Sequence, residues 1–200
     1  MVSLRGASRI WSGEAGLHPI DLDVEPGELV VVRGRSGSGK STLLALVAGV
    51  CEPGTGEVRV LGVPPRREMA WSDLALVPQV LALSAELSIA ENITDCAPGV
   101  DATRVDELLR RLNVVELADR AIDEVSMGQQ QRAALARAIV VGPKLLLADE
   151  PTSFQDEFHT GVVIEALRAA AGDGAAVLVA THDNAVVAAA DRVVALTSSG

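Results

Sequence analysis

The sequence predicts an α/β fold with a mostly parallel sheet, helices on both faces of that sheet, and an inserted helical subdomain. Apolar segments of strand length alternate with helical segments along most of the 200 residues, the order that produces a parallel sheet. A helix-rich stretch at 79–125 interrupts this alternation. Because aromatic residues make up only 2% of the chain, the core must consist of Leu, Val, Ile and Ala.

The first strands are predicted before residue 80. Residues 20–24 alternate apolar and acidic side chains, as in a half-buried strand, and Pro26-Gly27 marks the turn after it. Residues 29–32 form a continuous apolar run, which is typical of a strand buried on both faces. The remaining elements here are a helix at 42–48, which Gly49 ends, and short strands at 58–61 and 74–77.

The middle of the chain has helical patterns. Ser88 and Glu91 have the spacing of a capping box. Apolar residues recur at helical spacing from Val105 to Leu112, and Asp101 is an acidic residue near the start of that helix.

After this middle stretch, helices are expected at 132–141, 162–171 and 184–190, and strands at 145–148, 176–181 and 193–196. We therefore expect one domain, 1–200, with a core of 1–78 and 126–200 and a helical subdomain of 79–125.

Charge and composition exclude several classes of function. The formal net charge of −10 argues against binding to nucleic acid or to an anionic membrane surface. Cys51 and Cys96 are expected to be reduced thiols, because the N-terminus lacks the apolar region of a secretion signal. No apolar stretch approaches the roughly 18–20 residues of a membrane-spanning helix, so another chain would have to supply any membrane part.

Residues 34–41 carry the strongest chemical motif. With Thr42, they match the G-x-x-x-x-G-K-[ST] pattern without substitution: Gly34, Arg35, Ser36, Gly37, Ser38, Gly39, Lys40 and Ser41. Glycines let the backbone curl so that its N–H groups surround phosphates, and the following helix adds the positive end of its dipole. Lys40 would reach the β- and γ-phosphates of ATP, and Ser41 would bind Mg²⁺. The alternative, a flexible surface loop, does not explain the flanking strand and helix.

Asp149 and Glu150 follow the apolar run 145–148, at the sheet edge where ligands bind in open α/β proteins. We expect Asp149 to hold Mg²⁺ through water and Glu150 to act as general base on the attacking water. The alternative is a strand that simply ends in two solvated acids, which is common. The intact P-loop earlier in the chain favours the catalytic interpretation.

Residues 125–131 resemble the signature segment of the ATP-binding-cassette (ABC) ATPases, whose usual form is Leu-Ser-Gly-Gly-Gln. Ser126, Gly128 and Gln129 match, while Met127 replaces the first glycine. In the family this segment caps a helix whose N-terminus meets the γ-phosphate bound by the other subunit, and Ser126 is a natural N-cap. Met127 would be strained if its φ were positive and harmless otherwise. An ordinary N-cap of an amphipathic helix is the alternative.

Four more residues match the family's set in order. Trp11 resembles the aromatic residue that stacks on adenine, Gln79 the glutamine that contacts Mg²⁺ and water, and His182 the histidine that contacts the γ-phosphate and orients the water. Asp156 resembles the aspartate of the loop that crosses the dimer interface, although the two residues before it depart from the family's Ala-Leu. Taken singly, Trp11 fits a core or surface site, Gln79 a solvated surface, and His182 a structural role.

The resemblance runs from Trp11 to His182 and implies a P-loop core with an N-terminal antiparallel strand region. It implies an ATP hydrolase that works with Mg²⁺ as a homodimer, or as a heterodimer with another cassette, around two ATP molecules. Separate transmembrane permease chains would hold it at the cytoplasmic, inner face of the cell membrane, with their motion passing through a groove near residues 79–91. The run 147–152 also resembles cassettes of lipoprotein-release and macrolide-efflux systems. Cargo and direction of transport stay open.

Three other classes compete with a transporter subunit. The first is a soluble ABC-type ATPase in a non-transport assembly, such as cofactor assembly. The second, a P-loop GTPase or small-molecule kinase, leaves residues 125–131 unexplained and would need a guanine-specificity segment that we do not find. The third is a non-hydrolysing subunit, which the presence of Lys40, Glu150 and His182 disfavours, although Met127 and Gln155 leave room for it.

Overall fold

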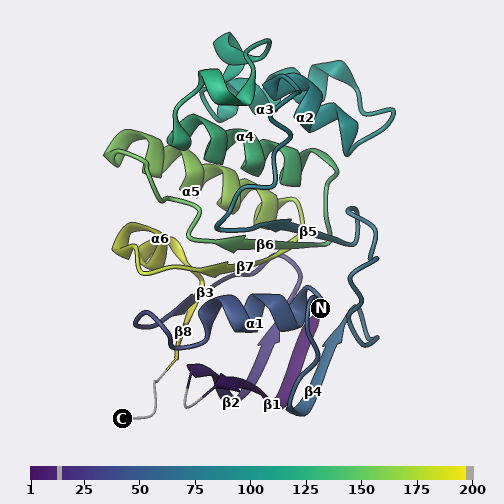
Figure 1. The fold of residues 1–200 in the computed structure, drawn as a ribbon, viewed down its shortest axis with the longest axis vertical. Helices are drawn as coiled ribbons and strands as arrows, with labels where there is room; N and C mark the ends of the chain where they lie inside the picture. Colours follow the sequence, from purple (N-terminus) through teal and green to yellow (C-terminus); the bar gives the residue numbers. More distant parts are fainter. Residues whose placement is uncertain (13–14, 197–200) are drawn as a thin grey trace.

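The computed structural model of the protein describes residues 1–12 and 15–196. Its centre is a five-stranded parallel sheet with the strand order β5-β6-β7-β3-β8 (Figure 1). The strands are β3 (Leu29–Arg33), β5 (Leu74–Val77), β6 (Leu145–Asp149), β7 (Ala176–Ala180) and β8 (Arg192–Ala195). Helices lie on both faces of the sheet, which confirms the α/β class expected from the sequence.

Side chains of the central strands alternate between two hydrophobic cores. In β3, Leu29 and Val31 belong to one core, whereas Val30 and Val32 belong to the other. All four are fully buried. Because both faces of the sheet are covered, a polar side chain would be buried on either face, and the strand is therefore a continuous apolar run.

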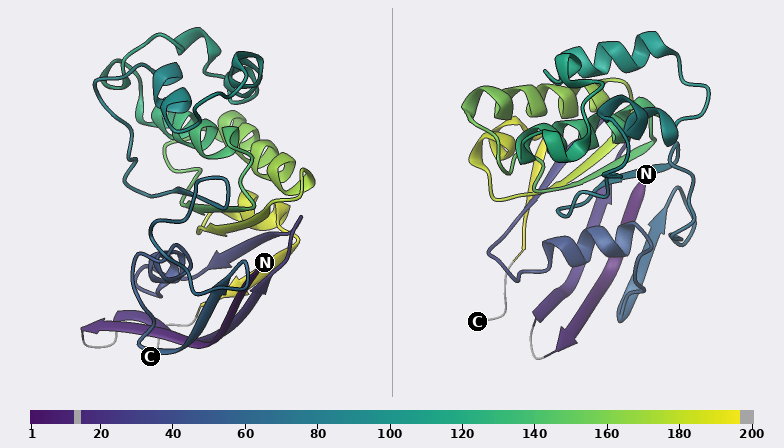
Figure 2. Two further views of the ribbon diagram at one scale, coloured as in Figure 1. Left: turned by 90° about the vertical axis from the view of Figure 1, so that its right-hand side faces the viewer. Right: turned by 45° about the horizontal axis from the view of Figure 1, so that its top comes forward.

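One face of the parallel sheet carries the larger group of helices. These are α4 (Met127–Val140), α5 (Glu157–Gly172) and α6 (Asn184–Ala189), with α2 (Ile89–Asp95) and α3 (Ala102–Arg111) packed outside α4 (Figures 1 and 2). The capping box expected at Ser88 and Glu91 is present at the start of α2, and Asp101 caps α3. Across the described residues, none of the helices is both long and apolar enough to cross a membrane.

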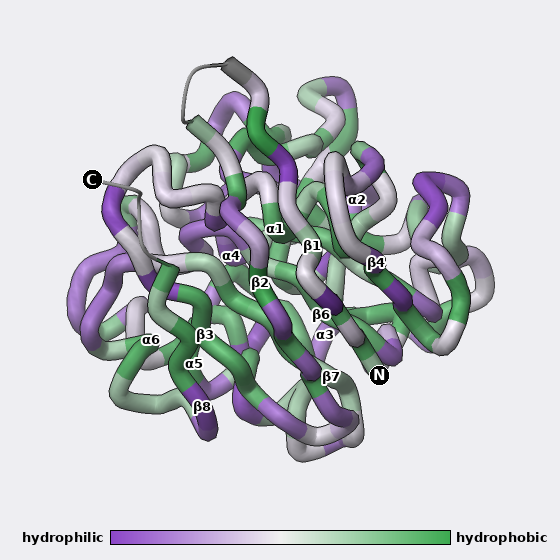
Figure 3. The backbone as a smooth tube through the Cα atoms, turned by 90° about the horizontal axis from the view of Figure 1, so that it is seen from below, coloured by the Kyte–Doolittle hydropathy of each residue, from purple (hydrophilic) through white to green (hydrophobic). Residues whose placement is uncertain are grey.

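The opposite face is covered by α1 (Lys40–Val47), which lies between the parallel sheet and a second, antiparallel sheet. That second sheet has the order β2-β1-β4, formed by β1 (Val2–Ser12), β2 (Ala15–Val24) and β4 (Thr55–Val60). Figure 3 views it from below, with hydrophilic and hydrophobic segments alternating along β2. The antiparallel region implied by the family resemblance is therefore present.

Several boundaries differ from those predicted. Strand β1 was not predicted from its own pattern, because bulges shift its register against both neighbours and Gly6 has φ 55°. Helix α1 begins at Lys40, two residues early, since Gly39 acts as its N-cap. Helix α4 likewise begins at Met127, directly after its Ser126 cap.

The inserted stretch is less helical than its pattern indicated. Within 79–125 the structure has α2, α3 and two short 3-10 helices, Val115–Leu117 and Ile122–Glu124, while residues 79–88 carry no helix. Side-chain bonds from Asn92 to Ser84 and its neighbours hold the end of that irregular segment. Helix α4 packs on both α2 and α3, so the helical layer continues beyond residue 125.

Candidate functional site

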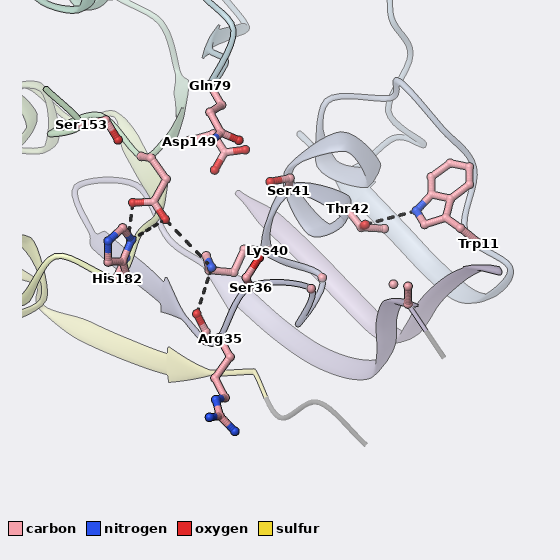
Figure 4. A pocket seen from close by; sticks show the side chains of 16 residues that line it. Trp11, Arg35, Ser36, Lys40, Ser41, Thr42, Gln79, Asp149, Ser153 and His182 are labelled. Atoms are coloured by element: carbon pink, nitrogen blue, oxygen red, sulfur yellow. Dashed lines mark hydrogen bonds and ion pairs between the residues drawn. The ribbon is translucent and has the colours of Figure 1, made fainter. Parts of the chain in front are cut away.

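A cavity of about 690 Å³ opens where β3, β6 and β7 end, and it collects most of the residues selected from the sequence (Figure 4). Those residues are Trp11, Gly34, Arg35, Ser36, Gly37, Gly39, Lys40, Ser41, Thr42, Gln79, Asp149, Glu150 and His182. Ala15, Gly16 and Ser153 also line the cavity and were missed by sequence reasoning. Segments far apart in the chain thus meet at one edge of the parallel sheet.

The loop between β3 and α1 forms one wall of the cavity. Gly39 has φ 92° and caps α1 without a side-chain hydrogen bond, so the first N–H groups of the helix have no acceptor within it. A Cβ atom on Gly39 would lie 2.6 Å from the Gly16 carbonyl oxygen, and one on Gly34 would lie 2.3 Å from Ser38 Oγ. Position 39 therefore requires glycine, because a Cβ atom there would meet backbone, whereas a side chain at Gly34 would have to displace the Ser38 hydroxyl. The loop is a close-packed cradle of backbone donors suited to an anion.

Ser38 differs from the other loop residues because it does not line the cavity. It is 2% exposed, and its backbone N–H donates to the Arg35 carbonyl at 3.1 Å. Its Oγ is a buried polar atom without a hydrogen-bond partner among the residues that the structure describes. In this structure, Ser38 therefore supports the loop from behind.

Lys40 lies between the loop and the acidic end of β6. Its Nζ donates to the Gly34 carbonyl oxygen at 2.9 Å and lies 4.0 Å from Glu150 Oε1. Burial raises the pKa of the Asp149 carboxyl, whereas a hydrogen bond from Ser41 and the charge of Lys40 lower it. The site therefore places two acids and one ammonium group, all largely buried, close together in the cavity wall.

Glu150 is the most heavily constrained acid of the site. Its Oε2 accepts from Thr181 Oγ1 at 2.8 Å, and its Oε1 is paired with His182 Nδ1 at 2.9 Å. Its backbone N–H donates to the Ala180 carbonyl at 2.8 Å, and its φ is 50°. The end of β7 thus fixes both the backbone and the carboxylate of Glu150, which lines the cavity beside Lys40.

Trp11 lies at the far side of the cavity, on β1. Its indole Nε1 donates to Thr42 Oγ1 at 3.3 Å, and the Arg9 guanidinium lies 4.6 Å from its ring centroid. Trp11 is 56% exposed, so a large aromatic surface remains in contact with solvent. Arg9 does not line the cavity, and the cation therefore backs the indole from outside.

Oxygen donors suited to a magnesium ion gather near the start of α1. Ser41, Asp149 and Gln79 face the same part of the cavity (Figure 4). Within the described ranges, no group of three or more His, Cys, Asp or Glu side chains could hold a metal by itself. Magnesium bound together with phosphates needs one or two carboxylates and completes its shell with water, so this donor set fits Mg²⁺ accompanied by a phosphate ligand.

Besides Ser38, four selected residues lie outside the cavity of the single chain: Ser126, Gly128, Gln129 and Asp156. Ser126 and Gln129 form a capping box at the start of α4, with bonds of 2.8 and 3.3 Å. Met127 is the first helical residue after this cap, so the replaced glycine brings no backbone strain. Asp156 caps α5 by accepting from the His159 backbone N–H at 2.8 Å.

Comparison with known proteins gives concordant matches. The family described as "ABC transporter" matches residues 17–153. The macrolide export ATP-binding/permease protein MacB of Nitrosomonas europaea is 36% identical over 97% of this chain. An uncharacterized ABC transporter ATP-binding protein of Mycobacterium tuberculosis is 36% identical over 94% of it.

The fold has solved counterparts. A dimeric, post-hydrolysis structure of the ATP-binding cassette MJ0796, bound to ADP and Pi, superposes with a TM-score of 0.87 and 28% identity. That match covers 99% of this chain and 95% of the other. By contrast, the chain spans 32% of the length of the MacB protein and 62% of that of the mycobacterial protein.

Proposed function

The chain belongs to the ABC transporter family, and we propose that it binds and hydrolyses ATP to power a membrane transporter. The observation that carries this proposal is the meeting of Lys40, Glu150 and His182 at one cavity, brought there from the start of α1 and from the ends of β6 and β7. The cavity volume of about 690 Å³ lies within the usual range for small-molecule sites.

ATP would bind with its phosphates in the loop of residues 34–41. The backbone N–H groups at the start of α1 and the Lys40 ammonium supply positive charge for the β- and γ-phosphates. Trp11 offers an exposed aromatic face to the adenine, and its bond to Thr42 ties the indole to the same helix.

A magnesium ion bound with ATP would be held by Ser41, with Asp149 and Gln79 reaching it directly or through water. When bound, it would offset the negative charge on the phosphates. Asp149 suits this role because it is only 7% exposed, so its carboxylate is poorly hydrated until a cation approaches.

Hydrolysis requires a base near the γ-phosphate, and Glu150 is placed for it. The carboxylate would take a proton from the attacking water as the water oxygen bonds to the γ-phosphorus and the bond to the β–γ bridging oxygen breaks. His182 would orient that water while bound to the carboxylate at 2.9 Å. Lys40 would offset charge that develops on the phosphoryl oxygens.

The signature-segment residues and Asp156, which lie outside the cavity, would act in a dimer with a second subunit. We propose that Ser126, Gly128 and Gln129 meet the ATP of a partner cassette, with the N-terminus of α4 facing its γ-phosphate, and that Asp156 lies at the same interface. The dimeric MJ0796 cassette, which shares the fold at 28% identity, supports this arrangement. Both a homodimer and a heterodimer with another cassette satisfy it.

Separate permease chains would complete the transporter and hold the cassette at the inner face of the membrane. Val80 is 85% exposed, and the adjacent Leu81 and Leu83 are half-buried, so the segment after Gln79 presents apolar surface for such a contact. The names of the similar proteins, which include a macrolide export protein, support transport over a soluble assembly role and support the macrolide-efflux resemblance of residues 147–152.

The test compares Mg²⁺-dependent ATPase activity of the wild type and Glu150→Gln, with the size of each in ATP. We expect the variant to lose about 10²–10⁴-fold in rate because it lacks the base, and to accumulate an ATP-bound dimer. Glu107→Gln on α3, an exposed position away from the cavity, is the matched control. Wild-type activity that Glu150→Gln leaves unchanged would refute the base role.

A further inference from the structure

The loop that leaves β6 adopts a conformation that needs support from elsewhere. Glu150 has φ 50° and Phe154 has φ 64°, and residues with a side chain rarely occupy this left-handed region. Such conformations persist where the surrounding structure over-determines them. The contacts of residues 150–155 with the rest of the fold therefore decide where the Glu150 carboxylate points.

Helix α4 supplies contacts at both ends of this loop. At the first end, Gln131 Nε2 donates to the Glu150 carbonyl oxygen at 2.9 Å. At the second end, Gln155 Nε2 donates to the Gly128 carbonyl oxygen at 2.9 Å, and Arg132 Nη1 donates to Gln155 Oε1 at 2.6 Å. Gln131 and Arg132 are 2% and 4% exposed, so water does not compete for these bonds.

The backbones also approach closely at the second end. A Cβ atom on Gly128 would lie 2.6 Å from the Phe154 carbonyl oxygen. Glycine is therefore needed at this position for the loop to pack on the first turn of α4, independently of any role toward a nucleotide. Gln155, one of the departures from the family pattern, adds its two hydrogen bonds at this contact.

We propose that Gln131 is a positioning residue that holds the backbone of Glu150, and that Gln155 secures the same loop at its other end. The Ala180 carbonyl fixes the peptide before Glu150, and the Gln131 amide, together with the Ser153 backbone N–H at 3.1 Å, fixes the peptide after it. Gln131 does not line the cavity, so it acts through Glu150 alone. The inference rests on the proposed hydrolysis of ATP by Glu150.

The same helix also links the two halves of the proposed dimer. Its N-terminal turn, at Ser126, is the part that we propose meets the partner's ATP, and Gln131 lies a little over one turn further along. If α4 shifts when the proposed dimer closes, the Gln131 side chain would pass that shift to the backbone of Glu150.

Gln131→Met tests the role, because methionine keeps the length of the side chain and lacks the amide donor. Gln130→Met is the matched control: Gln130 precedes Gln131 on α4, but its amide donates to Ile122 and Val125 carbonyls at 2.8 and 3.1 Å. We expect Gln131→Met to lower kcat about 10- to 100-fold, as misplacement of a catalytic group does. The KM for ATP should stay within about twofold, and Gln130→Met should keep kcat within about twofold.

A second readout does not depend on activity. In nucleotide-free protein, backbone amides of residues 150–156 should exchange hydrogen for deuterium faster in Gln131→Met than in the wild type or in Gln130→Met, because the loop opens locally more often. Gln155→Leu should increase exchange in the same segment. If Gln131 and Gln155 hold the same loop, the double variant Gln131→Met/Gln155→Leu should lose less in kcat than the two single variants predict when their free-energy effects are added.

The outcomes separate the two proposals. If the wild type hydrolyses ATP and Glu150→Gln does not, but Gln131→Met matches Gln130→Met in kcat, the positioning role is refuted while the proposed function stands. If the wild type and Glu150→Gln are equally inactive, the proposed function fails, and with it the role of Gln131 in hydrolysis. Unchanged exchange in residues 150–156 refutes the holding role in either case.

Discussion

Asn92 holds the segment that leads from the cavity edge into the helical layer. Asn92 belongs to α2 and is 3% exposed. Oδ1 accepts from the Ser84 backbone N–H at 2.8 Å, and Nδ2 lies 3.0, 3.2 and 3.0 Å from the carbonyl oxygens of Ser84, Leu87 and Ser88. Asn92→Asp keeps this shape and replaces the donor group with an acceptor.

The contacts set the size of the effect. The Nδ2 group has two hydrogens, so its three contacts amount to about two hydrogen bonds of about 1 kcal/mol each. The Ser84 and Ser88 carbonyls keep a backbone donor, from Leu87 and Asn92 at 3.3 and 3.0 Å, whereas the Leu87 carbonyl loses its donor, and that one loss costs about 1–3 kcal/mol in place of about 1 kcal/mol. We therefore expect Asn92→Asp to lower the free energy of unfolding by about 2–4 kcal/mol at pH 7. At about 2–4 °C per kcal/mol for a chain of this size, Tm should fall by about 5–15 °C.

The loss should depend on pH with a definite sign. The surrounding carbonyl groups disfavour a carboxylate, so the pKa of the introduced carboxyl should rise above its ordinary value near 3.9. An acid with a raised folded-state pKa gains stability as the pH falls through that pKa. The deficit of Asn92→Asp relative to the wild type should accordingly shrink between pH 7 and pH 4.5.

Thermal unfolding followed by circular dichroism at both pH values tests this reasoning. Asn92→Ala is the control, because it loses the same donors and adds no titrating group, so its deficit should not shrink in the same way. A wild-type Tm for Asn92→Asp at pH 7 would refute the role given to the amide. A deficit that grows on acidification would refute the sign.

Three further predictions concern the cavity and its surroundings. Lys40→Ala should weaken ATP binding at least about tenfold, measured by calorimetry in Mg²⁺, with the fold retained by circular dichroism. Arg9→Met removes the cation 4.6 Å from the Trp11 ring and should shift indole fluorescence in a Trp71→Phe background; an unchanged spectrum would contradict the stacked geometry. Hydrogen bonds from Arg168 and from the Leu29 backbone N–H lower the pKa of Asp191. The stabilisation by Asp191 is therefore present above about pH 4 and lost on acidification. In Asp191→Asn, the free energy of unfolding should depend less on pH below about pH 4, as measured by acid unfolding.

Elements whose cause is local were predictable from the sequence. The apolar run of residues 29–32 is a strand because both faces of the sheet are covered, and the Ser88–Glu91 spacing produces the capping box in the structure. The residues of the P-loop are consecutive in the chain, so a sequence pattern is enough to predict that loop. Asp149 and Glu150 could be placed because parallel strands end at one edge.

Contacts that depend on the tertiary fold had no such local cause. Ala15 and Gly16 reach the cavity because the β1–β2 hairpin packs over α1, where the Gly16 carbonyl lies against Gly39. Neither residue type suggests a nucleotide site. Ser153 lines the cavity because the chain turns back after Glu150, and the sequence of that turn carries no glycine that would indicate it.

The loop after β6 shows why local rules fail at the centre of the site. Glu150 and Phe154 both have positive φ, although neither is the glycine or asparagine that usually marks such a position. Gln131 of α4, which precedes the loop in the chain, and Gln155 of the loop itself sustain this conformation, and both donate to backbone carbonyl oxygens that no sequence motif records. In the proposed mechanism the Glu150 carboxylate faces a phosphate and must stand clear of its own strand, and the positive φ of Glu150 achieves that at a cost in local stability. Gln131 and Gln155 offset that cost, so the departure from local preference and the hydrogen bonds from α4 are two parts of one arrangement.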